Sequence, residues 1–241
     1  MNLVRLLFVL FCVTNSLAIG AEPISFERGG ISDSPGIVRP KSLQLEFGLL
    51  DYTNTNQSSY TLGTSLFRYG LIQDRFELRF LGSGLEFVDD GLNFNHIAPG
   101  FKVNLLKEQR HLPSLDLISH VAIPLDGNFA HFYKFLINKE LKEKLKFLTN
   151  LSLNFDNHQG HTDSYLPYVF DLNYELNAKL SALAEVFGTW SMTGDAGNPL
   201  GLAYGFTYLL SDDTGIDFTN FYGLNESAAD IGISFGMSHR F

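Results

Sequence analysis

Hydrophobic and polar residues alternate along most of this chain with a period of two. The last stretch shows the pattern most clearly, because Ile231, Ile233, Phe235, Met237 and Phe241 fall on one face, with small or polar residues on the other. This period is the signature of a β-strand with one apolar face. The sequence therefore predicts that the chain ends in a strand, and the same alternation upstream predicts further strands.

The alternation predicts about twelve strands after residue 41. Their expected positions are 42–49, 60–69, 74–81, 100–105, 115–123, 129–137, 145–155, 166–174, 178–188, 200–208, 216–222 and 229–241. Short turns are expected at 70–73, 107–112, 138–144, 175–177 and 211–214, and polar loops at 53–59, 82–95, 156–163 and 189–198. Residues 139–146 also have the spacing of a helical turn, although a solvated turn is favoured. An even strand number, with short turns at one end and longer loops at the other, is typical of an antiparallel up-and-down transmembrane β-barrel.

The polar faces of these strands carry charge. In the strand over 74–81, Phe76, Leu78 and Phe80 alternate with charged residues, each of which would cost ~2–4 kcal/mol at mid-depth if it faced lipid. A ring of about twelve strands is too wide for side chains to fill, so its interior is wet. A soluble sandwich would instead bury the charges in a dry core, which disfavours it. The expected lumen-lining residues are Glu46, Arg75, Glu77, Arg79, Lys102, Asp116, Lys179, Glu185 and Asp217.

The first 41 residues do not follow the barrel pattern. Residues 1–21 have a basic head, an apolar core over 6–13 and small residues before Glu22, which predicts a cleaved secretory signal peptide. The one cysteine, Cys12, follows Phe11, where a lipidation site would need a small residue. Residues 22–41 are rich in turn formers, and we expect a lead-in that lies in the periplasm or in the lumen. Residues 42–241 are the expected barrel.

Several short motifs resemble one known family. They are Ser34-Pro35, Arg39-Pro40, residues 43–48, residues 68–71, residues 76–79 and the closing Ser238-His239-Arg240-Phe241. In type, order and spacing they are similar to outer-membrane proteins named for the meta-pathway of phenol degradation. The resemblance implies a barrel in the outer membrane of Gram-negative bacteria that passes small molecules, hydrophobic or aromatic ones among them. The last strand also resembles the ending that barrel-assembly machinery reads, with Phe235, Met237 and Phe241 as the signal.

Other chemistry finds little support in the sequence. Asp156, His158, His161 and Asp163 lie close together, but no helix organises them, and we expect no metal site and no cofactor. His161 with Ser164, and Asp116 with His120, show no recognisable catalytic motif, so an enzyme is not expected. The net charge of −9 argues against nucleic acid as a partner.

Three functions remain open. The first is a passive channel for small solutes, the second a non-conducting structural or surface-binding protein in which residues 22–41 plug the bore, and the third an outer-membrane lipid hydrolase. The charges near Glu46 and Arg79 serve either selectivity or bracing of the barrel, and bracing is favoured.

Aromatic residues near predicted strand ends suit interfacial girdles in contact with lipid. They are Tyr52, Tyr60, Tyr69, Tyr133, Tyr165, Tyr174, Tyr208, Tyr222 and Trp190.

Overall fold

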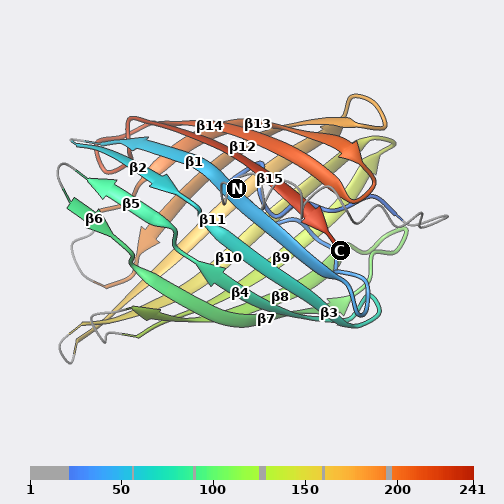
Figure 1. The fold of residues 1–241 in the computed structure, drawn as a ribbon, viewed down its shortest axis with the longest axis horizontal. Coiled ribbons are helices and arrows are strands. Elements are labelled where there is room, and N and C mark those ends of the chain that lie inside the picture. The colour runs from blue at the N-terminus through green and yellow to red at the C-terminus, as the bar shows by residue number, and fades with distance from the viewer. Residues whose placement is uncertain (1–21, 56, 89–90, 125–128, 159–160, 194–196) are drawn as a thin grey trace, which may run out of the picture.

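The chain forms one antiparallel sheet that closes on itself, as the computed structural model in Figure 1 shows. The structure describes residues 22–241 except 56, 89–90, 125–128, 159–160 and 194–196. Closure comes from β1, which pairs with β3 on one side and with β15 on the other. The strands are β1 Leu43–Asn54, β2 Ser58–Leu62, β3 Ser65–Ile72, β4 Phe76–Gly82, β5 Leu85–Val88, β6 Gly91–Asn93, β7 His96–Leu106, β8 Ser114–Pro124, β9 Ala130–Lys142, β10 Leu145–His158, β11 His161–Glu175, β12 Leu180–Ser191, β13 Leu200–Ser211, β14 Thr214–Gly223 and β15 Ile231–Arg240.

Twelve of these strands make the barrel wall, which confirms the predicted all-β barrel. They are β1, β3, β4 and β7 to β15, each paired with its neighbours in the order of the chain. The other strands, β2, β5 and β6, extend the wall at one rim, where β2 pairs with residues 51–54 of β1. The prediction of a single loop over 82–95 is therefore wrong. Strands β5 and β6 are only four and three residues long, and Gly82, Gly84 and Gly91 interrupt the alternation around them.

Other loops are also shorter than predicted. Strand β1 continues to Asn54, β10 and β11 reach His158 and His161, and β12 continues to Ser191. These strand ends are polar because a strand that projects beyond the bilayer needs no apolar face. Residues 139–142 belong to β9, and Lys144 has a left-handed φ of 70° in the tight turn before β10. The alternative of a helical turn over 139–146 is thus wrong.

The two faces of the wall differ in polarity. On β13, Leu202, Tyr204 and Phe206 are 42–43% exposed on the outside, whereas Gly201 and Ala203 are buried inside. Because soluble proteins place large apolar side chains inside, this inversion suits an outer face in contact with lipid. Within the part of the chain that the structure describes, no helix is long and apolar enough to cross a membrane.

The two rims can be told apart by their connections. Strand β1 starts and β15 ends at the rim that carries the short turns 73–75, 143–144 and 212–213. We call it the terminal rim, and the opposite end the loop rim. Short turns lie on the periplasmic side of outer-membrane barrels, so the terminal rim is the periplasmic one. Tyr174 and Tyr208 are exposed near it, and Tyr222 and Trp190 are exposed towards the loop rim, as aromatic girdles require.

Candidate functional site: the lumen and its lead-in segment

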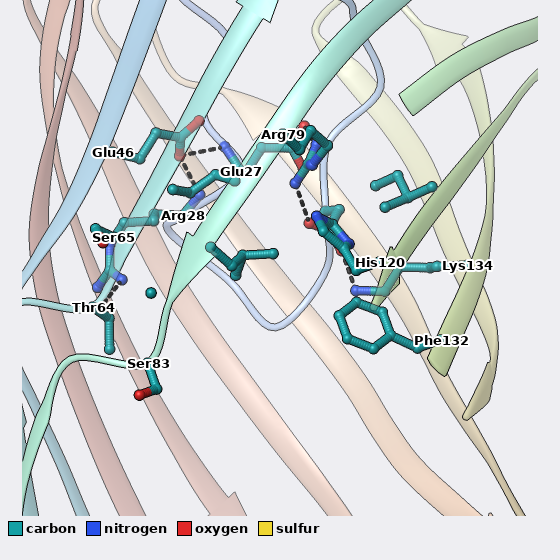
Figure 2. Close-up of a pocket in the computed structure, with 15 residues that line it drawn as sticks. Glu27, Arg28, Glu46, Thr64, Ser65, Arg79, Ser83, His120, Phe132 and Lys134 are labelled. Carbon is teal, nitrogen blue, oxygen red and sulfur yellow. Dashed lines mark hydrogen bonds and ion pairs between the residues drawn. The ribbon is translucent and has the colours of Figure 1, made fainter. Parts of the chain in front are cut away.

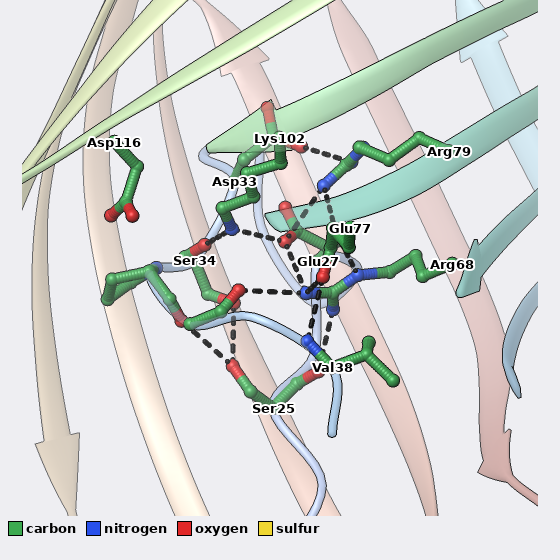
Figure 3. Close-up of polar contacts among 12 residues, drawn as sticks. Ser25, Glu27, Asp33, Ser34, Val38, Arg68, Glu77, Arg79, Lys102 and Asp116 are labelled. Carbon is green, nitrogen blue, oxygen red and sulfur yellow. Dashed lines mark hydrogen bonds and ion pairs between the residues drawn. The ribbon is translucent and has the colours of Figure 1, made fainter. Parts of the chain in front are cut away.

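Residues 22–41, the lead-in segment, run inside the barrel as a hairpin (Figure 3). The segment enters at the terminal rim, where the backbone N–H of Ile24 donates to the carbonyl of Asp212 at 2.8 Å. Deeper in the lumen, the backbone N–H of Ser32 donates to Glu185 of β12 at 2.8 Å. It then returns to the terminal rim, where Arg39 lies 3.2 Å from Asp213. Both ends of the segment are thus held at the same rim.

Glu27 is the centre of a buried ion-pair cluster. Its carboxylate lies 2.8 Å from Lys102 of β7, 3.2 Å from Arg79 of β4 and 3.2 Å from Arg68 of β3. Burial raises the pKa of Glu27, but these three cations outweigh that effect and hold the pKa well below its usual range. Glu27 therefore carries a full negative charge, which compensates wall cations that would otherwise repel one another.

Two wall carboxylates connect this cluster to the backbone of the segment. Arg68 lies 3.1 Å from Glu46 of β1 and 2.8 Å from Glu77 of β4. Glu46 accepts hydrogen bonds from the backbone N–H groups of Glu27 and Arg28 at 2.9 and 3.0 Å. Glu77 accepts one from the N–H of Val38 at 2.8 Å. Charge-assisted bonds of this kind are about twice as strong as neutral ones, so wall and segment form one network.

The opposite charge pattern appears where Arg28 meets the wall. Its guanidinium lies 3.1 Å from Asp51 of β1 and 3.5 Å from Asp217 of β14, and it donates to the hydroxyl of Ser234 of β15 at 2.7 Å. Glu27 therefore faces wall cations, and Arg28 faces wall acids. This complementarity fixes the position of the segment in the lumen.

Asp33 contacts the wall at three strands. Its carboxylate lies 3.4 Å from Arg79 and also pairs with Lys134 of β9. Its backbone N–H donates to Asn150 of β10 at 2.6 Å. The segment thus touches the wall on both sides of the barrel.

Small wall residues make room for the segment. A Cβ at Gly215 of β14 would lie 2.0 Å from the ring of Phe26, and one at Gly205 of β13 would lie 2.3 Å from the carbonyl oxygen of Gly29. No side chain fits at such distances, so the glycines on these inward faces permit close approach of the segment.

Most of the lumen-lining candidates lie inside the barrel. The buried ones are Glu46, Glu77, Arg79, Lys102, Asp116, Glu185 and Asp217. Asp116 accepts a hydrogen bond from Asn104 at 2.9 Å. Arg75 differs from the prediction, because it lies exposed in a turn at the terminal rim, outside the strands whose alternation would direct it inward. Lys179 is also exposed in a turn at that rim, but it lines the cavity there.

Sequence reasoning missed several members of the network. Arg68 lies in a strand whose alternation is weak, although Phe67 and Tyr69 on either side point to lipid and could have revealed it. Glu27, Arg28 and Asp33 lie in a segment without a period, so no pattern predicted their partners.

The segment lines cavities towards both rims. One of about 280 Å³ lies towards the loop rim, between the segment and strands β3, β4, β8 and β9 (Figure 2). We call it the loop-rim cavity. The other, of about 470 Å³, lies towards the terminal rim and is lined by Lys146, Asn173 and Lys179 among others. Arg28 of the segment contributes to both. Residues of the lead-in segment therefore line both cavities.

The metal and catalytic candidates are not assembled. Among the residues described, no group of three or more His, Cys, Asp or Glu is placed to hold a metal. His161 lies 3.5 Å from Asp163, and the side chain of His158 is outside the described part. The hydroxyl groups of Ser164 and Thr193 form a hydrogen bond at 3.2 Å. The ring of His120 packs on that of Phe132. The predicted signal peptide and Cys12 also lie outside the described residues.

A family model matches residues 26–241, which include nearly all of the barrel and most of the segment. The family is described as "Putative MetA-pathway of phenol degradation". The chain belongs to this family. The resemblance drawn from the short motifs is thereby confirmed. Among curated proteins, no match was found.

Solved structures with the same fold are outer-membrane proteins. An outer-membrane channel from Pseudomonas putida F1 has a TM-score of 0.68 at 9% identity, over 86% of this chain and 98% of that one. The porin NanC gives 0.61 at 9% identity, over 82% and 98%. The porin KdgM, in complex with disordered oligogalacturonate, gives 0.58 at 7% identity, over 83% and 99%. At such low identity the likeness establishes the fold, which is that of outer-membrane β-barrels and confirms the predicted location.

Proposed function

We propose that this protein is a passive outer-membrane channel for small molecules, and that the lead-in segment sets the width of its passage. The observation that carries the proposal is the segment itself, held by ion pairs across a charged lumen with a cavity on either side. A bore whose wall is charged takes up water, and solutes can diffuse through water without an energy source. Similarity to porins and to an outer-membrane channel supports the same function.

We propose small solutes, hydrophobic or aromatic ones included, as the cargo. The cavities, at about 280 and 470 Å³, fall at the low end of the volumes of ligand sites, so a polysaccharide would not fit with the segment in place. The description of the family, which refers to phenol degradation, supports an aromatic solute.

A second candidate is a non-conducting barrel that the segment seals. The many contacts of Glu27, Arg28 and Asp33 favour this candidate, because a segment tied so firmly leaves little free cross-section. The proposal gives the protein no catalytic role, since the candidate residues Ser164, His161 and His120 do not form a site.

The test is single-channel conductance in planar bilayers. The protein without residues 22–41 is compared with the full-length protein and with a matched control, Gly91→Ala in β6, far from the segment. We expect the deletion to raise the conductance and the control to leave it unchanged. Equal conductance with and without the segment would refute its role. Current from the deletion variant alone, with none from the full-length protein or the control, would favour the barrel that the segment seals.

We also propose that Phe235, Met237 and Phe241 form the signal for barrel assembly. All three project to the lipid side of β15 or just beyond it, where they are accessible to a membrane partner.

A further inference from the structure

The loop-rim cavity has an apolar side and a polar side. Four apolar side chains point into it from separate strands: Leu66 of β3, Leu81 of β4, Ile118 of β8 and Phe132 of β9. Many inward positions of this barrel are polar or charged, so these four side chains give the cavity an apolar side that suits a ring. A cavity of about 150 Å³ accommodates benzene, and this one, at about 280 Å³, has room for a ring with a polar substituent.

The polar side of the cavity holds groups without partners. His120 is 3% exposed, and neither of its ring nitrogens has a hydrogen-bond partner among the described residues. Arg79 is 4% exposed, and its Nε is also without a partner. Buried polar atoms that lack partners are costly, so both groups gain from a ligand that offers acceptor oxygens.

A carboxylate already sits at the mouth of this cavity. Asp33 reaches from the segment to pair with Lys134 and lies 3.4 Å from Arg79, which is the longest of the ion contacts of Arg79. The side chains of Asp33 and Lys134 are 16% and 25% exposed, whereas that of Arg79 is 1% exposed. Lys134 is therefore the cation that a solute from the loop rim meets first, and its present partner is a carboxylate that an incoming anion can replace.

We propose that the loop-rim cavity binds a small aromatic monocarboxylate, whose carboxylate displaces Asp33 from Lys134 and Arg79. The ring lies between Phe132 and Ile118, and the N–H of His120 donates to the ligand. Displacement of Asp33 removes one ionic tether of the lead-in segment, so this ligand favours release of the segment. The inference builds on the proposed channel function for the route of the ligand, but binding itself does not require conduction.

Isothermal titration calorimetry tests the site, with the full mature protein folded in a detergent with a neutral head group. Benzoate is the probe, and benzamide and acetate are the comparison compounds that lack the charge and the ring. We expect saturable binding of benzoate. Benzamide and acetate should each bind with an affinity at least about tenfold lower. Equal heats from all three compounds, or no saturable heat from benzoate, would overturn the proposal.

Two variants locate the binding. Lys134→Gln is expected to weaken benzoate binding about tenfold or more, and Asp33→Asn to tighten it, because the internal competitor is gone. Lys107→Gln, which removes an exposed cation paired with Asp74 at the terminal rim, is the matched control and should leave benzoate binding unchanged. Asp33→Asn decides the matter if Lys134→Gln does not fold, as judged by its electrophoretic mobility before and after boiling. Unchanged affinity in Asp33→Asn would refute the site whatever the conductance shows.

Discussion

The carboxylate of Glu27 lies 2.8 Å from the ammonium group of Lys102, which joins the middle of the lead-in segment to strand β7. Neither side chain is more than 2% exposed. An ion pair so deeply buried is stabilising only while both partners are present, because either charge alone would be left without water or a counter-ion. The position of the segment in the bore therefore depends on this pair and on its neighbours Arg68 and Arg79.

Replacement of Glu27 by Gln is expected to release the segment. The change leaves three buried wall cations without their shared anion, and breaking a buried pair costs about 3–5 kcal/mol. Limited proteolysis of folded protein in detergent measures the release, since a freed segment is cut faster while the barrel resists. Lys107→Gln removes an exposed pair with Asp74 and serves as the control, with an effect below about 1 kcal/mol. Equal cleavage of the two variants would show that Glu27 does not hold the segment.

The contribution of Glu27 should persist in mild acid. Its pKa lies well below the ordinary value of 4.5, so its stabilising effect is complete above that value and is lost only as the pH falls towards the lowered pKa. The difference in cleavage rate between the native protein and Glu27→Gln should therefore be the same at pH 7 and pH 5. A difference that disappears between these pH values would mean that Glu27 is protonated there.

Gly215 and Phe26 should be energetically coupled. Gly215→Ala places a methyl group where the ring of Phe26 lies, and overpacking of this kind costs about 1–3 kcal/mol. Phe26→Ala removes the obstacle, so the double variant should be less destabilised than the sum of the single changes. Unfolding in urea of protein refolded in lipid vesicles measures the three values. Strict additivity would show that ring and strand do not meet.

The last residue should matter for assembly rather than for folded stability. Phe241→Ala removes an aromatic side chain that is 46% exposed beyond β15, whereas its backbone N–H, which donates to Leu43 at 2.8 Å, remains. We expect less folded protein in the outer membrane of expressing cells. Phe80→Ala removes a 40% exposed ring from the outer face of β4 and is the control. Equal amounts of both variants would argue against an assembly signal at Phe241.

The wall of this protein can be read from its sequence, because a period of two specifies both the strands and their lipid-facing sides. Glu77 and Arg79 were placed inside by their apolar neighbours alone. At strand ends both faces are wet, so alternation no longer indicates where a strand stops or which side chains face inward, as at Asn54 and Arg75. It also fails for the lead-in segment, since the partners of Glu27 follow from a hairpin path that no local pattern encodes.

Because both ends of the lead-in segment are held at one mouth of the barrel, it can be withdrawn through that mouth without being unthreaded. Its contacts with the wall are mainly ion pairs and hydrogen bonds to side chains, so withdrawal leaves the strand ladders of the cylinder intact. A pull at the terminal rim, on the end of the segment at Glu22, acts along the direction of exit. A ligand that enters from the loop rim cannot pull on either end of the segment, so it must weaken the ion pairs from within the bore.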